Sequence, residues 1–159
     1  MNKNTNITLL TILLLLALSV FSAYIVEYGL GHKPCKLCLY QRYPYYISIF
    51  LILNIIIIKK YIKLSLLILS LVSLIGSFVA FYHFGIEQGF FKESLVCTTE
   101  NLSENLTKEE LLKQLNQNTV SCKDVSFRIF GFSLAAINTI FSLILSVIFA
   151  KLFMNYGKN

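Results

Sequence analysis

The sequence predicts an all-α membrane protein in which four transmembrane helices form one bundle with two outward loops. Hydrophobic residues make up 56% of the 159 residues and charged residues only 14%, whereas a soluble domain carries about 25% charged residues. The mean hydropathy of +0.69 excludes intrinsic disorder, and four apolar stretches are long enough to cross a bilayer. The net charge of +6 does not indicate nucleic-acid binding, because the basic residues form no run in this apolar chain.

The four apolar stretches follow one another in a single membrane domain, 1–159. A bilayer core of about 30 Å requires about 20 helical residues at about 1.5 Å each. We expect the spans at approximately 7–26, 41–58, 64–84 and 131–152. Gln41, Arg42 and Pro44 stand near the membrane surface at the start of the second span, among tyrosines that are typical of an interfacial belt.

The charges predict the orientation, since cytoplasmic segments carry an excess of Lys and Arg. The opposite, outward side has eight basic and eight acidic residues. The side of both termini has six basic residues and no acidic one: Lys3, Lys59, Lys60, Lys63, Lys151 and Lys158. We therefore expect both termini in the cytoplasm and the loops at approximately 27–40 and 85–130 outside it.

The first span has one alternative interpretation, a cleaved signal peptide. Ser22 and Ala23 are small residues after an apolar run, as at a cleavage site. Apolar residues continue through Val26, and Lys3 alone makes up the basic region before the run. These features favour a retained helix.

Small and hydroxyl residues recur at helical spacing within two spans. They let helix backbones approach closely in lipid, so we interpret them as packing seams. The alternative is an ion pathway, but no span holds the mid-membrane acid or base that marks a transporter. The residues are Ser70, Ser73, Gly76, Ser77 and Ala80 in the third span, and Ala135, Asn138, Ser142 and Ser146 in the fourth.

All four cysteines lie in the predicted outward loops. Cys35 and Cys38 form a Cys-x-x-Cys pair in the first loop, and Cys97 and Cys122 stand 25 positions apart in the second. An oxidising compartment favours disulfides, and a Cys-x-x-Cys pair is typical of exchange chemistry because one thiol can attack the other's mixed disulfide. If a helix begins near Cys38, Arg42 lies one turn further on the same face, where its charge favours the Cys38 thiolate.

Two other interpretations of the cysteines stay open on spacing alone. One is a structural zinc site, although such ribbons normally offer two close pairs and this chain has one. The other is a pair of inert structural disulfides. Neither explains an arginine one turn after the close pair at a span boundary.

Two features of the outward side remain. Thr107 with Glu110 forms a capping box, and the leucines that follow predict a short amphipathic helix near 107–115, on the membrane surface or against the bundle. His83 ends the third span. It is either a histidine at the interface without a function or a donor to a carbonyl headgroup near the close cysteine pair.

The motif Pro-Cys-Lys-Leu-Cys-Leu-Tyr-Gln-Arg at 34–42 resembles that of the DsbB-type disulfide bond formation proteins, bacterial inner-membrane thiol:quinone oxidoreductases. The resemblance extends over essentially the whole chain. It includes the Tyr82-His83 pair, the spaced cysteines of the second loop and the Phe-Gly-Phe-Ser run at 130–133. The Cys-x-x-Cys-x-x-x-Arg element is its most specific part.

The resemblance implies an enzyme that re-oxidises a periplasmic thioredoxin-fold protein of the DsbA kind. Cys97 would form the mixed disulfide with that partner, and Cys122 would be its mate. The implied disulfides are Cys97–Cys122 and Cys35–Cys38. Electrons would pass from the first pair to the second and then to a quinone, ubiquinone or menaquinone, with Cys38 next to the quinone ring.

For the quinone, the resemblance implies Arg42, His83 and Gln88 as binding residues, and it implies no metal. Some members carry a glutamine four residues after the histidine; here that position is Glu87, with Gln88 next. The redox loops would face the periplasm from the inner membrane. The alternative function is a non-catalytic membrane scaffold with two structural disulfides. A reductant exporter is disfavoured, because the predicted cytoplasmic side has no cysteine.

Overall fold

The computed structural model describes residues 3–92, 97, 121–123, 128, 129 and 131–156. Its long helices are α1 (Lys3–Tyr24), α3 (Tyr43–Ile58), α4 (Ile62–Glu87) and α6 (Leu134–Asn155). A π-helical turn, η1 (Ile25–Gly29), extends α1, and the short helix α2 (Lys36–Tyr40) precedes α3. Strands β1 (Arg128–Ile129) and β2 (Phe132–Ser133) pair antiparallel just before α6. The amphipathic helix expected near 107–115 lies outside the described residues.

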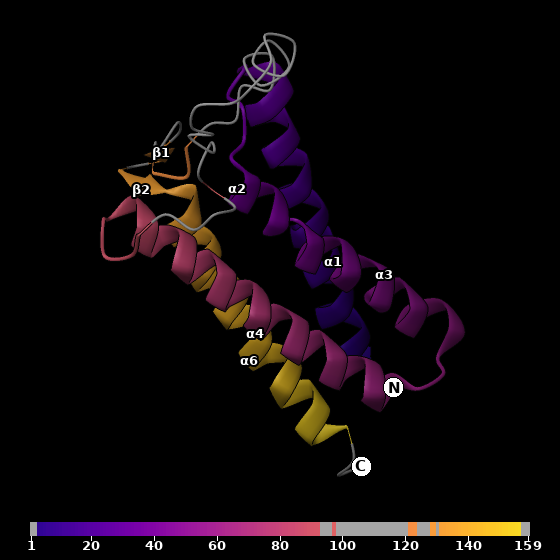
Figure 1. Ribbon diagram of the computed structural model, residues 1–159. Coiled ribbons are helices and arrows are strands. Elements are labelled where there is room, and N and C mark those ends of the chain that lie inside the picture. The colour runs from indigo at the N-terminus through magenta and orange to yellow at the C-terminus, as the bar shows by residue number, and fades with distance from the viewer. Residues whose placement is uncertain (1–2, 93–96, 98–120, 124–127, 130, 157–159) are drawn as a thin grey trace, which may run out of the picture.

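The predicted fold class is confirmed. Four segments are long and apolar enough to cross a membrane: Asn4–Gly29, Lys36–Ile58, Ile62–Glu87 and Leu134–Asn155. The long helices run along the length of the molecule in Figure 1, and both marked chain ends lie away from α2, β1 and β2. The orientation of this bundle in a membrane stays a prediction.

The second membrane segment is divided in two at Gln41 and Arg42. The carbonyl of Arg42 accepts hydrogen bonds from the backbone N–H groups of Tyr45 and Tyr46, which starts a new helix. Pro44 occupies the first turn of α3, where its missing N–H costs nothing. The segment therefore begins at Lys36, before the expected residue 41, and its short first helix carries the Cys-x-x-Cys pair.

The last membrane segment begins later than expected, at Leu134. The Ser133 hydroxyl caps α6 by accepting from the Ala136 N–H at 3.2 Å. Gly131 turns the β1–β2 hairpin with a φ of +85°, a conformation that favours glycine. Residues 131–133 therefore belong to the hairpin and the cap, not to the membrane helix.

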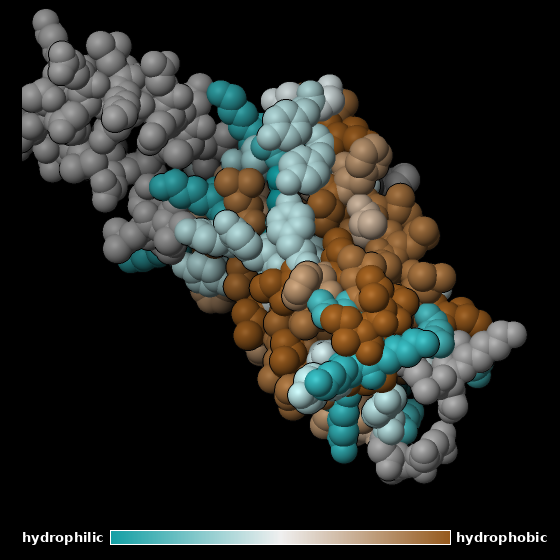
Figure 2. Space-filling view, turned by 90° about the vertical axis from the view of Figure 1, so that its right-hand side faces the viewer, coloured by the Kyte–Doolittle hydropathy of each residue, from teal (hydrophilic) through white to brown (hydrophobic). Residues whose placement is uncertain are grey.

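The interior of the bundle is apolar and its outside is apolar too. Large side chains on the outside are exposed, as Leu14, Phe50 and Ile57 illustrate. Such a surface suits lipid and not water, and Figure 2 shows it as a brown region across the middle of the visible face, with teal residues towards the ends. The buried core consists of Leu9, Ile12 and Leu16 of α1, Ile52 and Ile55 of α3, Ile62, Leu66 and Leu69 of α4, and Leu145 and Phe149 of α6.

Helices α4 and α6 form the most extensive helix pair, and the predicted packing seams lie between them. The hydroxyls of Ser70 and Ser146 each donate to the backbone carbonyl of the other, at 3.2 and 3.0 Å. Ser77 donates to the Thr139 carbonyl at 3.1 Å. At Gly76 a Cβ would lie 3.2 Å from Pro44, so the glycine also lets α3 approach α4. The interpretation of these residues as packing seams is confirmed.

Candidate redox site

The close cysteine pair begins helix α2. Cys35 is the N-cap, and its Sγ accepts a hydrogen bond from the Cys38 backbone N–H at 3.3 Å. The two Sγ atoms lie 2.8 Å apart and both thiols are free. The resemblance implied a Cys35–Cys38 disulfide, which requires the two sulfurs at about 2.05 Å. The redox state of this pair stays a prediction.

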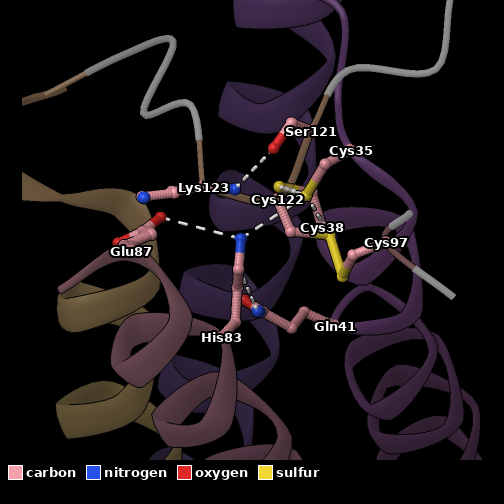
Figure 3. Close-up of a disulfide and its surroundings, with 9 residues drawn as sticks. All are labelled: Cys35, Cys38, Gln41, His83, Glu87, Cys97, Ser121, Cys122 and Lys123. Atoms are coloured by element: carbon pink, nitrogen blue, oxygen red, sulfur yellow. Dashed lines mark hydrogen bonds and ion pairs between the residues drawn. A yellow bond between two sulfur atoms is a disulfide. The ribbon is translucent and has the colours of Figure 1, made fainter. Parts of the chain in front are cut away.

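The second pair meets the first at the same place. Cys97 and Cys122 are joined by a disulfide with Cα atoms 5.4 Å apart. Both are buried, in one cluster with Cys35, Leu37 and Ile86. The Sγ atoms of Cys35 and Cys122 and a ring nitrogen of His83 all lie within 4.8 Å of one another. Figure 3 shows the free pair beside the disulfide.

These sulfurs do not form the four-cysteine zinc site that spacing alone left open. Cys35, His83 and Cys122 offer three potential ligand atoms. The Cys122 sulfur is bonded to Cys97, and a disulfide sulfur is not the thiolate that zinc requires.

His83 is buried, with 3% of its surface exposed, so it is not an exposed interfacial residue. Its Nε2 lies 3.5 Å from the Cys35 Sγ and 3.7 Å from Oε1 of Glu87, one helical turn further along α4. Its Nδ1 lies 2.8 Å from Nε2 of Gln41.

The end of α4 is fixed by Gly89, whose φ is +78°, and by hydrogen bonds from the backbone N–H groups of Phe90 and Phe91 to the Gly85 carbonyl.

Two amides, the buried Gln41 and the half-buried Asn138, hold the histidine ring. Asn138 of α6 donates from Nδ2 to Oε1 of Gln41 at 2.6 Å. The Asn138 oxygen accepts from the hydroxyls of Tyr45 and Ser142. With its oxygen engaged in this way, Gln41 presents its N–H to His83 Nδ1. The remaining ring proton of a neutral His83 is then on Nε2, directed at Cys35 and Glu87.

This relay was not predicted as part of the site. Asn138 was identified only as a member of a packing stripe, and Gln41 only as a surface residue of the second span. The available signal was an amide within each apolar segment, since buried amides need partners. Their connection to His83 joins residues 42 and 97 positions apart, which local patterns do not reveal.

The surroundings favour a thiolate at Cys35. Its hydrogen bond with the Cys38 thiol is the largest cause that lowers the pKa of Cys35, from 9.0 to about 5. Burial opposes this shift, while the hydrogen bond and charge of His83 and the Cys38 backbone N–H add to it. These contacts favour the thiolate form of Cys35.

Arg42 reaches the site but does not pair with Cys38, contrary to our expectation. Its Nη1 lies 2.6 Å from Oε2 of Glu27, and its guanidinium stands 5.2 Å from the centre of the Tyr24 ring. Sequence reasoning missed Glu27. The signal was an acid at the end of an otherwise apolar first span, which needs a cation when it is part-buried. The π-helical turn η1 carries this residue.

The structure separates Glu87 from Gln88. Glu87 is buried, faces His83 and lines the cavity beside the cysteines. Gln88 is exposed and is not among the residues that line this cavity. One helical position turns a side chain by about 100°, so only one of the two can face the site. Of the two, Glu87 and not Gln88 lines this cavity, and a binding role for either residue stays a prediction.

A cavity of about 390 Å³ opens beside the free cysteines. Cys35, Cys38, Arg42, His83 and Glu87 contribute to its wall. Apolar side chains of α1 and α6 supply much of the rest, among them Val20, Ala23, Leu134, Ile137 and Phe141. Small-molecule sites typically have this form, apolar with a few polar groups and about 300–1,000 Å³ in volume.

This membrane bundle brings together a free Cys-x-x-Cys pair, a disulfide and a cavity. This combination is typical of a membrane thiol oxidoreductase. Residues 5–152 match the family model of the disulfide bond formation protein DsbB. The chain therefore belongs to the DsbB family. It is also similar to "Uncharacterized protein RP370" of Rickettsia prowazekii (strain Madrid E), with 30% identity over 99% of this chain and 90% of that protein. No solved structure matches the chain.

Proposed function

We propose that this chain re-oxidises a periplasmic thioredoxin-fold protein of the DsbA kind and passes the electrons to a membrane quinone, ubiquinone or menaquinone. The observation that carries the proposal is the meeting of the two cysteine pairs, with the Cys35 and Cys122 sulfurs within 4.8 Å of each other. Thiol–disulfide exchange requires such direct approach of a thiolate to a disulfide sulfur. The family supports disulfide bond formation as the overall reaction.

The exchange begins at Cys97. A thiolate of the partner attacks Cys97 of the Cys97–Cys122 disulfide, and Cys122 leaves as a thiolate. Cys122 then attacks Cys35 of an oxidised Cys35–Cys38 pair, and Cys38 leaves. The partner's second thiol attacks the partner sulfur of the mixed disulfide, and Cys97 leaves as a thiolate. Cys97 then attacks Cys122 of the Cys122–Cys35 disulfide, and Cys35 leaves. The partner is then oxidised and Cys35 and Cys38 are reduced.

The arrangement of the sulfurs is compatible with this order. Cys97–Cys122 is bonded and lies beside the unbonded Cys35 and Cys38. The lowered pKa of Cys35 also suits it to leave as a thiolate, because a thiol of low pKa is a good leaving group.

The cavity beside Cys38 fits a quinone by the chemistry of its wall. Its apolar side chains suit a ring and a lipid tail, and Arg42 and His83 are the polar groups that would hold the ring oxygens. A bound quinone accepts two electrons and two protons. Arg42 would stabilise negative charge that develops there, once its ion pair with Glu27 is loosened or shared.

The test is anaerobic mixing of the purified chain, a reduced DsbA-like partner and a short-chain quinone, followed by quinone absorbance. Cys97→Ala should form no mixed disulfide with the partner. Cys38→Ala should abolish quinone reduction, and Arg42→Ala should slow it about 100-fold, as the loss of one charge-stabilising group does. Lys36→Ala is the matched control, since Lys36 is an exposed cation of α2, and should keep the rate. Normal quinone reduction by Cys38→Ala would overturn the proposal.

The alternative of a non-catalytic scaffold has less support. It requires two disulfides that staple the loops, whereas Cys35 and Cys38 are free thiols beside a cavity. A scaffold also gives no reason to bury His83 against Cys35. Four cysteines that stay unreactive to thiol reagents during cycling with the partner would favour it.

A further inference from the structure

The Glu87 carboxyl is a buried acid that the exchange steps do not use. Its side chain is 6% exposed. Within the described part of the chain, its Oε2 is buried without a hydrogen-bond partner, while Oε1 lies 3.7 Å from His83 Nε2. An ionised carboxylate with an unpaired oxygen is costly to bury. A carboxyl that carries a proton removes most of this cost.

The nearest source of that proton is the Cys35 thiol. Both groups approach the same ring atom, since His83 Nε2 lies 3.5 Å from the Cys35 Sγ and 3.7 Å from Oε1 of Glu87. Gln41 holds Nδ1 as an acceptor, which leaves Nε2 as the ring position that carries a proton. Figure 3 shows dashed lines from His83 to Cys35 on one side and to Glu87 on the other.

The charges around Glu87 keep its state coupled to that of Cys35. A thiolate and a carboxylate that share one imidazole repel each other. Cys38 stands next to Cys35. Burial and the Cys35 charge favour the protonated carboxyl of Glu87, whereas the Ser133 hydroxyl and Arg128 of β1 favour the ionised one. Lys123 is a further cation, on the segment that carries Cys122. Arg42 is occupied by Glu27 across the cavity.

We propose that Cys35 and Glu87 share one proton across the Nε2–H group of His83, so that the Cys35 thiolate forms as Glu87 becomes a carboxylic acid. At equilibrium the S–H bond of Cys35 breaks and an O–H bond forms on the Glu87 carboxylate, while His83 keeps its Nε2 proton and donates it as a hydrogen bond to whichever of the two groups is anionic. No electrons move, and the net charge of the three groups is unchanged. The inference rests on the proposed function, because it describes how Cys35 is kept ready as a thiolate for exchange.

Alkylation of Cys35 tests this without quinone or partner. The rate of iodoacetamide labelling is measured against pH by mass spectrometry in quinone-free chain that keeps the Cys97–Cys122 bond and has Cys35 and Cys38 reduced. Two coupled acids that share a proton titrate in two steps. We expect two steps for the wild type and for Glu87→Asp, and a single step for Glu87→Gln.

Gln88→Glu is the matched control, because it places a carboxyl on the adjacent exposed position. It should leave the two-step profile unchanged, and the double variant Glu87→Gln/Gln88→Glu should not recover the second step. Wild-type and Glu87→Gln profiles that superimpose would overturn the inference. Since neither quinone nor partner is present, this failure is distinguishable from failure of the proposed electron path.

A second measurement guards against a purely structural effect of Glu87→Gln. The infrared spectrum of the reduced chain should contain the carbonyl band of a protonated carboxylic acid at a pH where Cys35 is a thiolate. This band should be lost in Glu87→Gln and kept in Gln88→Glu. A fully ionised Glu87 in the wild type under these conditions would contradict the shared proton.

Discussion

At the scale of single residues, the site is built to keep one sulfur anionic. Cys35 receives a hydrogen bond from the Cys38 thiol and another from the Cys38 backbone N–H, and His83 faces it from α4. Each of these contacts favours the charged form, and together they outweigh the cost of burial. The reactivity of Cys35 is therefore a property of its neighbours and not of the Cys-x-x-Cys spacing alone.

Because the thiolate is favoured only in the folded chain, Cys35 makes stability depend on pH. Its pKa is lowered from 9.0 to about 5, so this contribution is complete above pH 9 and is lost as the pH falls through 5. For the reduced chain we expect the free energy of unfolding to increase by about 2 kcal/mol more in the wild type than in Cys35→Ser between pH 5 and 7. Thermal unfolding in detergent measures the difference.

The same experiment has an internal control. Oxidation of Cys35–Cys38 to a disulfide removes the titrating thiol, so the oxidised wild type should follow the pH dependence of Cys35→Ser. If reduced wild type and Cys35→Ser have parallel stability profiles from pH 5 to 7, the lowered pKa of Cys35 is contradicted.

Sequence reasoning identified the residues of the site that carry a chemical signature and missed those that act through long-range contacts. The four cysteines, Arg42 and His83 stand in recognisable motifs. Glu27 and Asn138 have no local signature, because their partners are 15 and 97 positions away. The sequence left the choice between Glu87 and Gln88 open, and the helical phase of α4 favours Glu87.

At the scale of elements, apolar length and helical spacing sufficed to predict four helices and a packing stripe on α4 and on α6, but not that the two stripes face each other. Boundaries were less predictable where backbone geometry decides them. The break between α2 and α3 depends on the hydrogen bonds to the Arg42 carbonyl, and the start of α6 depends on the Ser133 cap. The break after α2 positions Cys38, and the Ser133 cap at the start of α6 lies beside Glu87.

The turn from α3 to α4 carries backbone strain without glycine. Lys59 and Tyr61 have φ values of 53° and 55°, in the left-handed region that costs a non-glycine residue about 1 kcal/mol. Lys59→Gly should therefore leave the chain more stable than Lys60→Gly by about 1 kcal/mol, since both add the same unfolded-state freedom and Lys59 also ends α3. Thermal unfolding in detergent measures this.

Lys60→Gly is the matched control for that change. It removes the same charge from the same turn, but Lys60 is not one of the residues with positive φ. It should be neutral or destabilising because glycine gains more freedom in the unfolded chain. Equal effects of the two substitutions would show that charge, and not backbone conformation, determines the stability of this turn.

At the scale of the whole molecule, the redox site and the packing of the bundle are one polar system. Asn138 accepts from Ser142, its neighbour on α6, and Ser142 lies beside Gly76 of α4. The serine contacts of α4 and α6 continue the same seam further along the helices. The amide relay that orients His83 is therefore fixed by the same helix contacts that hold the membrane bundle together.

The asymmetry of charge along this bundle predicts its orientation. Lys59 and Lys60 lie in the α3–α4 turn and Lys63 in the first turn of α4. Lys63 stands 5.6 Å from the ring centre of Phe153 near the end of α6. This places the basic turn and the C-terminal end of α6 together, while the cysteines lie at the opposite ends of α3 and α4. Because an excess of Lys and Arg marks the cytoplasmic side, the cysteines should face the periplasm.

Labelling with a membrane-impermeant maleimide tests this orientation, with single cysteines placed in a chain whose four native cysteines are replaced by alanine. In intact spheroplasts Lys33→Cys, at an exposed position two residues before Cys35, should be labelled. Tyr156→Cys, at the exposed end of α6, should be labelled only after the membrane is permeabilised. Replacing the three lysines of the α3–α4 turn and the start of α4 with glutamate should yield molecules of both orientations, because it removes half of the six basic residues on that side. Labelling of Tyr156→Cys in intact spheroplasts would reverse the orientation and leave the cysteines without access to a periplasmic partner.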